Sequence, residues 1–527
     1  MKKSLFSIIS YFALATLIFI PDNFFAQSLT KAGALFNFVG ETKQAEKRVS
    51  VAGVRQQSIK INFKTIDSLQ AEQIEIPLFD GEVLQAVKRE TEGFVRQNAD
   101  TFSWTGKIYS EDGSSSDVIL TVYKNAMSGL IYAPSGVYSI IPQAKGAHIL
   151  VEIDQSLFPA NEDDVEIVDA SNEANPFTQQ SSVLDQTFEL FGQSPNNSNQ
   201  QLAPQVDDGS RIDVMIVYTD DVRAFLGGTT QAQAFAQQAV TLTNTAYQNS
   251  AIATRVRLVH AVEINYAEAS NSSTHLNYVR NDATIATLRN TYKADAVSFF
   301  TETSNSGNCG LASLMGVSNH SAAFESRAFS TGKRSCAIDN LTFPHELGHN
   351  QGANHDPDNA GTTPANAVFP YASGHFSAAG NFRTVMTYPA ACSGCPRRPY
   401  FSNPNVLFGG QPTGIVDQRD NARTINNTAL VFSRFRESLV VTAASVTVGG
   451  RVVALRERGV NQAVVSLTNQ SGNTRMVRTN SSGYYRFDKV TAGETYLISA
   501  SSKRYSFAAK VVNVTEELLE LDFTAQQ

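Results

Sequence analysis

The sequence predicts a multidomain chain, with a β-rich N-terminal domain, an α/β domain in the middle and an all-β sandwich at the C-terminus. Three observations support this order. The first part is a series of short apolar segments separated by turn signals such as Asp112-Gly113. The middle alternates apolar strands with amphipathic helices, and the last part returns to short strands punctuated by glycine. At about 150 residues per domain, 527 residues have room for several domains.

Residues 1–26 are typical of a secretory signal peptide. Lys2 and Lys3 form a positive n-region, residues 5–20 are mostly apolar, and Ala26 precedes a suitable cleavage site. The apolar run is short for a membrane-spanning helix of about 20 residues, although retention as an anchor stays open. We therefore expect a secreted, extracellular protein with no membrane span after signal removal.

Residues 27–160 form the β-rich domain, and residues 161–205 differ from it in composition. The predicted strands of the β-rich domain lie at residues 57–63, 106–110, 118–123 and 129–132. Residues 161–205 begin near the acidic run Glu162-Asp163-Asp164 and continue with runs of glutamine, serine and asparagine. This low-complexity, polar composition predicts a linker.

Residues 206–437 form the α/β domain. Strands are predicted at residues 213–217, 255–262 and 296–300, and a helix at residues 282–292. Another helix is predicted where the apolar residues Phe235, Ala239, Leu242 and Ala246 share one face. Strands that alternate with helices favour a sheet layer covered by helices.

A histidine motif within this domain carries the clearest chemical signal. His345 and His349 are four residues apart, so on a helix both imidazoles point at one ion. Gly352 suits the left-handed turn that ends a helix, after which the chain can bring in His355. Because Pro344 is tolerated only in the first helical turn, the helix should start near Leu341 or Thr342.

Three imidazole ligands indicate a catalytic zinc site. They leave a fourth tetrahedral position for water, which becomes nucleophilic near neutral pH. Glu346 follows the first ligand, so its carboxylate can act as general base toward that water. The motif therefore predicts a hydrolase with one catalytic Zn²⁺. The alternative is an amphipathic helix whose histidines are only packed or solvated.

A second segment, Thr384-Val385-Met386-Thr387-Tyr388-Pro389, follows the motif. With the histidines, it makes the chain resemble the metzincin zinc peptidases. The resemblance implies an α/β metzincin fold with an active-site helix and a Met-turn, in which Met386 forms a hydrophobic floor below the zinc. Asp356 resembles the structural aspartate of the reprolysin (adamalysin) branch. Tyr388 resembles the astacin and serralysin tyrosine, which ligates zinc or steadies the intermediate; a structural tyrosine is the alternative.

Further residues refine this resemblance. The segments Cys392-Ser-Gly-Cys395 and Tyr400-Phe-Ser-Asn-Pro404 are most similar to bacterial reprolysin-like enzymes, including peptidyl-Asp metallopeptidases. That similarity raises the hypothesis of cleavage beside aspartate, with Arg397 or Arg398 pairing with the acidic side chain.

The segment that starts at Cys309 resembles the edge strand above the metzincin cleft, which pairs with the substrate backbone. Gly310 and Ala312 would contribute by being small. The four cysteines allow three pairings. Proximity in sequence favours Cys309–Cys336 and Cys392–Cys395.

A folded segment, a linker and then a protease is the layout of a zymogen, so we interpret residues 27–160 as a prodomain. A permanently attached accessory domain is the alternative. No cysteine precedes Cys309, which excludes inhibition by a prodomain thiol. We expect inhibition by filling of the cleft, or by a carboxylate such as those of residues 162–164.

Residues 440–527 form the predicted C-terminal sandwich. The pattern around Gly450, Gly483 and Gly493 resembles carboxypeptidase-regulatory-like domains, which implies a spacer or a module that docks at the cell surface.

The function predicted from all these features is that of a secreted zinc endopeptidase acting on protein or peptide substrates. The alternative is a cell-surface binding protein with an inactive, metal-stabilised protease-like domain, and a narrow processing enzyme also stays open. The net charge of −7 gives no support for nucleic acid as a partner. We expect a monomer, and structural calcium stays open.

Overall fold

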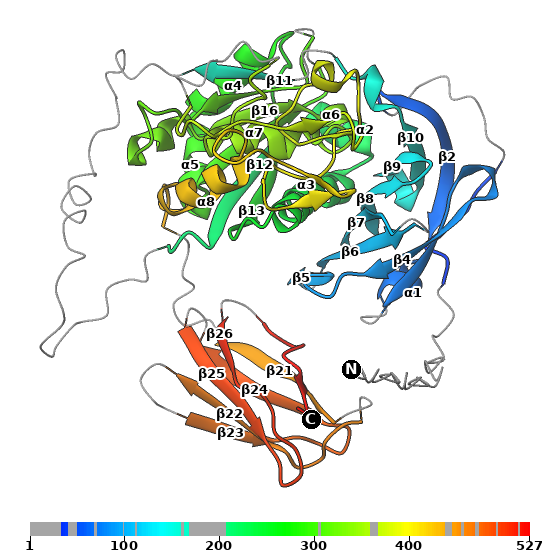
Figure 1. The fold of residues 1–527 in the computed structure, drawn as a ribbon, viewed down its shortest axis with the longest axis vertical. Helices are drawn as coiled ribbons and strands as arrows, with labels where there is room; N and C mark the ends of the chain where they lie inside the picture. Colours follow the sequence, from blue (N-terminus) through cyan, green and yellow to red (C-terminus); the bar gives the residue numbers. More distant parts are fainter. Residues whose placement is uncertain are drawn as a thin grey trace, which may run out of the picture.

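The computed structural model describes residues 33–40, 50–67, 71–98, 100–110, 113–159, 163–167, 207–303, 307–358, 367–437, 445–454, 458–469, 474–491, 494–514 and 517–526. They form three folded parts in chain order, shown from blue to red in Figure 1. The predicted signal peptide, Glu162 and most of the predicted linker lie outside these residues. No helix among the described residues is long and apolar enough to cross a membrane.

The N-terminal part is one antiparallel sheet with the strand order β1-β2-β10-β9-β8-β7-β6-β4-β3, and β5 also pairs with β6. Its elements are β1 (Phe36–Phe38), β2 (Gly53–Ile61), α1 (Phe63–Asp67), β3 (Gln73–Pro77), β4 (Val83–Lys88), β5 (Phe94–Asn98), β6 (Thr101–Tyr109), β7 (Ser115–Tyr123), β8 (Ala126–Ala133), β9 (Gly136–Pro142) and β10 (His148–Ile153).

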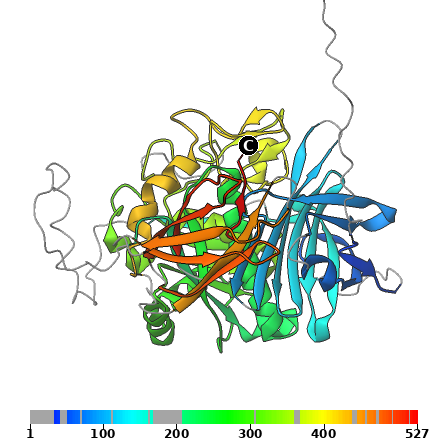
Figure 2. The ribbon, with the colours of Figure 1, turned by 90° about the horizontal axis from the view of Figure 1, so that it is seen from below.

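The two faces of this sheet serve different cores. Val118 and Leu120 of β7 join the N-terminal part's own core around Trp104. Ile119, between them, joins the core of the next part, because successive side chains of a strand point to opposite faces. Figures 1 and 2 show the blue and cyan sheet lying beside the green α/β part. The N-terminal sheet and the α/β part therefore share one hydrophobic layer.

The central part is built on a six-stranded sheet with the order β11-β15-β16-β14-β12-β13. The strands are β11 (Asp163–Ile167), β12 (Arg211–Thr219), β13 (Arg255–Ile264), β14 (Ala296–Thr301), β15 (Gly310–Leu314) and β16 (Phe329–Lys333). The helices are α2 (Asp220–Leu226), α3 (Thr229–Asn249), α4 (Ser272–Asn281), α5 (Ala283–Tyr292), α6 (Arg334–Ala337), α7 (Thr342–Asn350) and α8 (Asn421–Phe432). The pair β15–β16 is antiparallel, and the pairs β11–β15, β12–β13, β12–β14 and β14–β16 are all parallel.

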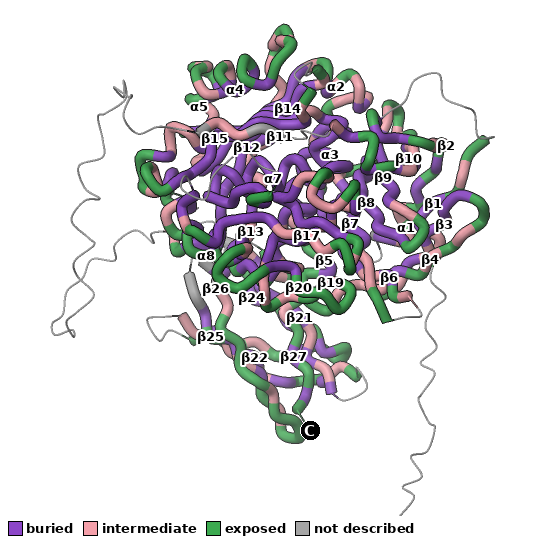
Figure 3. The backbone as a smooth tube through the Cα atoms, turned by 45° about the horizontal axis from the view of Figure 1, so that its top comes forward, coloured by how far each residue is buried: buried purple, intermediate pink, exposed green. Residues whose placement is uncertain are grey.

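Helices cover both faces of this sheet, as the alternation of strands and helices predicts. Ile216 of β12 joins the core that contains α3 and α7, whereas Val217 joins the core that contains α4 and α5. Asp282 caps α5 by accepting a hydrogen bond from the backbone N of Ile285 (2.9 Å), which explains why the helix starts there. Figure 3 shows α3 and α7 in purple, buried in the middle of the molecule.

One predicted boundary is wrong. The linker was expected from residue 161, but residues 163–167 form β11, which lies parallel to β15 at the edge of the sheet. A strand edge offers unpaired N–H and C=O groups to any extended segment, whatever its side chains. Backbone pairing therefore outweighs the polar composition of this segment.

Small hairpins and a separate sandwich complete the fold. The hairpins are β17 (Phe376–Ser377) with β18 (Phe382–Arg383), and β19 (Leu407–Phe408) with β20 (Gln411–Pro412). The sandwich contains β21 (Ser445–Val453), β22 (Val464–Asn469), β23 (Thr474–Arg478), β24 (Tyr484–Thr491), β25 (Glu494–Ser501), β26 (Lys510–Val514) and β27 (Phe523–Thr524). Its sheets, β24-β21-β27 and β23-β22-β25-β26, enclose a core of their own.

Candidate metal centre

The helix α7 presents the histidine motif and is buried along its whole length. It begins at Thr342, as the position of Pro344 predicts, after Leu341 in a left-handed conformation (φ 59°). It ends at Asn350, two residues before Gly352, which has φ +86°. A Cβ atom there would lie 2.6 Å from Cγ1 of Val368, so both the backbone conformation and the available space require glycine.

Three histidines of the motif meet in one buried cluster. Nε2 of His355 lies 3.0 Å from Nε2 of His345 and 3.0 Å from Nε2 of His349. All three side chains are at most 3% exposed. The turn at Gly352 thus brings the third imidazole back to the face of α7 that carries the first two.

Backbone carbonyls orient two of these imidazoles. Nδ1 of His345 lies 2.8 Å from the carbonyl oxygen of Val385, and Nδ1 of His349 lies 2.9 Å from that of Ala353. A carbonyl can only accept, so each Nδ1 carries the proton and each Nε2 presents a lone pair to the centre of the cluster. The helix end and the segment before Met386 therefore fix the two tautomers.

Burial keeps the imidazoles neutral. It lowers the pKa of His349 to about 4, against the opposing hydrogen bond to the Ala353 carbonyl. Burial, followed by the neighbouring His349 and the positive charge of Arg397, lowers the pKa of His345 and of His355 well below the usual value. All three side chains are thus in the form that binds metal ions.

This donor set fits a zinc ion. Nitrogen atoms bound to one tetrahedral Zn²⁺ at about 2.05 Å lie about 3.3 Å apart, close to the observed 3.0 Å. Two Nε2 lone pairs at that distance repel each other unless a cation or a proton lies between them, and the low pKa values disfavour a proton. The cluster has the composition and spacing of a three-histidine zinc site.

Glu346 lies directly below the start of β15. Its carboxylate is buried, and a Cβ atom on Gly310 would lie 2.2 Å from its Oε1. The expectation that Gly310 matters because it is small therefore has a specific cause, which is the space that the Glu346 carboxylate fills. Ala312, two residues along β15, is fully buried.

Asn350 joins α7 to the sheet, and the sequence analysis did not single it out. Its Nδ2 donates to the carbonyl oxygens of Ser313 (2.8 Å) and Phe329 (3.1 Å), in β15 and β16. The backbone N of Met315 donates to the His349 carbonyl (3.0 Å). These bonds hold the edge strand in register with the histidines. No spacing rule identifies Asn350, since its partners come from distant strands.

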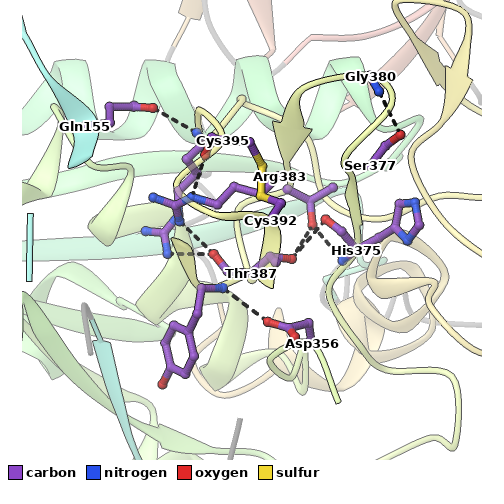
Figure 4. The surroundings of a disulfide bond; sticks show 12 residues. Gln155, Asp356, His375, Ser377, Gly380, Arg383, Thr387, Cys392 and Cys395 are labelled. Atoms are coloured by element: carbon purple, nitrogen blue, oxygen red, sulfur yellow. Dashed lines mark hydrogen bonds between the residues drawn. A yellow bond between two sulfur atoms is a disulfide. The ribbon is translucent and has the colours of Figure 1, made fainter. Parts of the chain in front are cut away.

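Met386 packs below α7. It is fully buried, and a Cβ atom on Gly348 would lie 2.8 Å from its Sδ. Asp356 accepts a hydrogen bond from the backbone N of Tyr388 (3.2 Å), which ties the end of the histidine motif to the turn (Figure 4). The ring of Tyr388 lies 4.4 Å from that of His355, centroid to centroid.

Two buried arginines support the turn after Met386, and Figure 4 labels one of them, Arg383. Arg383 donates to the carbonyl oxygens of Cys395 (Nε, 3.1 Å) and Thr387 (Nη1, 2.7 Å). Arg397 donates to those of Thr387 (Nη2, 3.2 Å) and Asn340 (Nη1, 2.8 Å). The guanidinium of Arg397 thus binds backbone carbonyls of the fold, which the hypothesis of an acidic side chain as its partner did not foresee.

Arg398, the other arginine of that hypothesis, faces the N-terminal part. Its guanidinium carbon lies 5.4 Å from the ring centroid of Tyr132 in β8 and 5.3 Å from that of Phe408. The cysteines form the bonds Cys309–Cys336 and Cys392–Cys395, which are the pairs that proximity in sequence favours.

Comparison with known proteins gives two family matches. Residues 208–402 match the metallo-peptidase family M12, and residues 447–526 match the carboxypeptidase regulatory-like domain. The chain is 34% identical over 326 residues to the peptidyl-Asp metalloendopeptidase of Xanthomonas campestris pv. campestris, which covers 60% of this chain and 69% of that protein. The protein of the same name from Stenotrophomonas maltophilia R551-3 is 29% identical over 337 residues, or 62% and 72% of the two chains.

Proposed function

Since the chain belongs to metallo-peptidase family M12 and is a zinc metalloendopeptidase, we propose that His345, His349 and His355 bind its zinc ion and that Glu346 is its general base. The observation that carries this proposal is the convergence of three histidine Nε2 atoms, two of them on imidazoles oriented by backbone carbonyls, next in sequence to the carboxylate that Gly310 accommodates. The two carbonyl bonds to Nδ1 preorganise the ligands, so little reordering accompanies metal binding.

Each residue of the site has a separate role in peptide hydrolysis. When bound, the zinc ion supplies Lewis acidity toward the attacking water and the scissile carbonyl. Glu346 accepts the proton of that water and later delivers it to the leaving amine. Met386 acts as the hydrophobic floor of a Met-turn, and Asp356 anchors that turn through the backbone N of Tyr388. Tyr388 flanks His355 at the site, and a purely structural role remains its alternative.

The edge of β15 that faces away from β16 is the place for the substrate backbone. An extended peptide adds to such an edge through main-chain hydrogen bonds. In this chain β11 occupies that edge, which supports a zymogen in which the N-terminal part blocks the cleft until it is removed. The shared hydrophobic layer with α3 would hold the prodomain in place.

The disulfide bonds of the chain support the proposal that the protein is secreted. Two disulfides form and persist in an oxidising compartment, and residues 1–26 have the composition of a signal peptide. Mass spectrometry of protein recovered from the medium should find the N-terminus at residue 27 or, after prodomain removal, shortly before β12. Retention of residues 1–26 on a membrane would contradict this part.

The names of the relatives support a preference for acidic substrates. Both curated relatives cited above are called peptidyl-Asp metalloendopeptidases, and we extend that preference to this enzyme. The competing idea of an inactive, metal-stabilised binding protein gains no support from these relatives. It also gives no reason for a buried carboxylate beside the histidines.

A quenched-peptide assay with purified, processed enzyme tests the general base. Glu346→Gln should lower kcat by roughly 10²-fold or more, while elemental analysis still finds one zinc per chain. Glu325→Gln, which weakens an ion pair with Arg436 that involves no residue of the histidine motif, is the matched control and should keep wild-type activity. Full turnover by a zinc-loaded Glu346→Gln enzyme would refute the assignment.

A further inference from the structure

The strand β11 places one acidic side chain, that of Glu166, against Arg280 and Ser313 of the catalytic part. In the pairing of β11 with β15, Glu166 lies opposite Ser313. Leu311 of β15 belongs to the core below α4, whereas Gly310 faces Glu346 on α7. Because side chains alternate along a strand, Ser313 shares the α4 face with Leu311. Glu166 therefore points to the face of the sheet opposite the histidines.

Two side chains of the catalytic part bind the Glu166 carboxylate directly. Arg280, in the last turn of α4, donates from Nη1 to Oε1 (3.2 Å) and from Nη2 to Oε2. Ser313 donates from Oγ to Oε2 (2.8 Å), and its oxygen accepts from Nη2 of Arg280 (2.8 Å). Nη1 of Arg327 lies 4.0 Å from Oε2. A bidentate guanidinium with a hydroxyl donor is the geometry by which proteins recognise a carboxylate.

The residues that contact the Glu166 carboxylate belong to the catalytic part, whereas Glu166 itself belongs to the segment before it. Arg280, Ser313 and Arg327 come from α4, β15 and the 3₁₀ turn Ala322–Arg327. The side chain of Arg280 is only 10% exposed, and Glu166 is its one ion-pair partner within the described ranges. Removal of the prosegment would leave this cation without its carboxylate, and another anion could then take the place.

We propose that Arg280, Ser313 and Arg327 form a subsite for an acidic side chain of the peptide substrate, and that Glu166 occupies this subsite in the precursor. The proposal rests on the proposed function. A substrate strand on the edge of β15 would place alternate side chains on the α4 face, as β11 does. Ser313 lies three residues beyond Gly310, so the recognised residue would be roughly 10 Å from the position above Glu346. This acidic residue is thus distinct from one beside the scissile bond.

The first test compares pairs of quenched peptides with the processed enzyme from the full chain. Each pair differs only by Glu or Gln at one position, scanned from two to four residues on either side of the scissile bond. We expect one position at which kcat/KM favours Glu roughly tenfold to a hundredfold. Arg280→Gln should bring that ratio close to one by raising KM for the Glu peptide alone, and Arg280→Lys should retain part of it.

The matched control is Arg223→Gln on α2, which removes a partly exposed ion pair to Glu263 of β13 and should leave the ratio unchanged. Chelator-sensitive cleavage without a Glu preference at any scanned position overturns the subsite but keeps the proposed function. The subsite is also overturned if Arg280→Gln retains the ratio or slows both peptides equally. Absence of chelator-sensitive cleavage of every peptide overturns the proposed function itself.

A second test needs no protein variant, so it stands even where Arg280→Gln fails to fold. A synthetic peptide with the sequence of residues 161–169 is compared with its E166Q form as an inhibitor of the processed wild-type enzyme. We expect the natural peptide to inhibit roughly tenfold more tightly, with the difference shrinking at high salt because the pair is charged. Equal inhibition by the two peptides, or none by either, overturns the subsite.

Discussion

A Cβ atom on Gly310 would lie 2.2 Å from Oε1 of Glu346, so the edge strand and the proposed general base occupy adjoining space with no room for a side chain between them. The first residue of β15 and the second residue of the histidine motif are thereby coupled. The strand proposed to bind the substrate also sets the position of the carboxylate.

This contact predicts the effect of Gly310→Ala. The added methyl group must displace either the Glu346 carboxylate or β15, so kcat should fall roughly 10²-fold while bound zinc, measured by elemental analysis, stays at one per chain. Gly332→Ala in β16 is the control, because a Cβ there meets nothing closer than 3.6 Å and needs no left-handed backbone. Equal activity of the two variants would show that the Glu346 position does not depend on Gly310.

Metal removal should lower the stability of the full chain. Three buried, neutral imidazoles bind an ion in the folded state only, so saturating zinc at about 100 times Kd adds about 2.7 kcal/mol. Thermal unfolding should show a lower Tm with chelator and recovery with added zinc. Glu346→Gln should keep this zinc-dependent shift and His355→Ala should lose it. A Tm that is indifferent to zinc in the wild type would argue against the three-histidine site.

Acid should release β11 from the edge of β15. Burial alone would raise the pKa of Glu166, but the hydrogen bonds and positive charge of Arg280, with help from Ser313 and Arg327, outweigh it and lower the pKa. Because the folded-state pKa of Glu166 is lowered, the ionised pair stabilises the docking of β11 fully at pH values above the ordinary Glu pKa, near 4.3. That stabilisation is lost as the pH falls through the lowered value.

Hydrogen exchange of the full-length precursor, kept intact by Glu346→Gln, measures this release. Protection of the β11 amides should drop below about pH 4. The same precursor with Glu166→Gln should have weaker protection at neutral pH and no such step, which controls for the pH dependence of exchange itself. A step that persists in the Glu166→Gln precursor would assign the release to another group.

The contact between the N-terminal part and α3 should contribute measurably to stability. Thr241 accepts a hydrogen bond from Thr121 of β7 (2.9 Å), and its hydroxyl lies 2.7 Å from that of Ser103 in β6. Thr241→Val leaves these buried hydroxyls without that partner, which costs about 1–3 kcal/mol. Chemical denaturation of the full chain should show this loss, whereas the exposed Thr287→Val on α5 should change little. Identical free energies of unfolding for both variants would mean that the hydrogen bonds of Thr241 do not stabilise the interface.

Short-range features of the site could be predicted from the order of residues alone. The pitch of a helix places His345 and His349 on one face, and the conformational demand at Gly352 explains how His355 returns to them. Proline sets the start of α7 for the same local reason. The strands β12 and β14 follow from their apolar runs, since residues buried on both faces leave a continuous hydrophobic signal.

Long-range pairing decided the position of β11 and the partners of Glu166 and Arg397. Nothing in the polar composition of residues 163–167 indicates that they pair with β15, because a strand edge binds backbone groups and is indifferent to side-chain identity. Glu166 obtains its partners from positions 280, 313 and 327, and Arg397 donates to carbonyl oxygens of residues 340 and 387. The chemistry of the metal site was therefore local and readable from the sequence. Which segment pairs with the edge of β15, and which arginine binds its carboxylate, depended on contacts between segments far apart in the chain, which only the folded molecule defines.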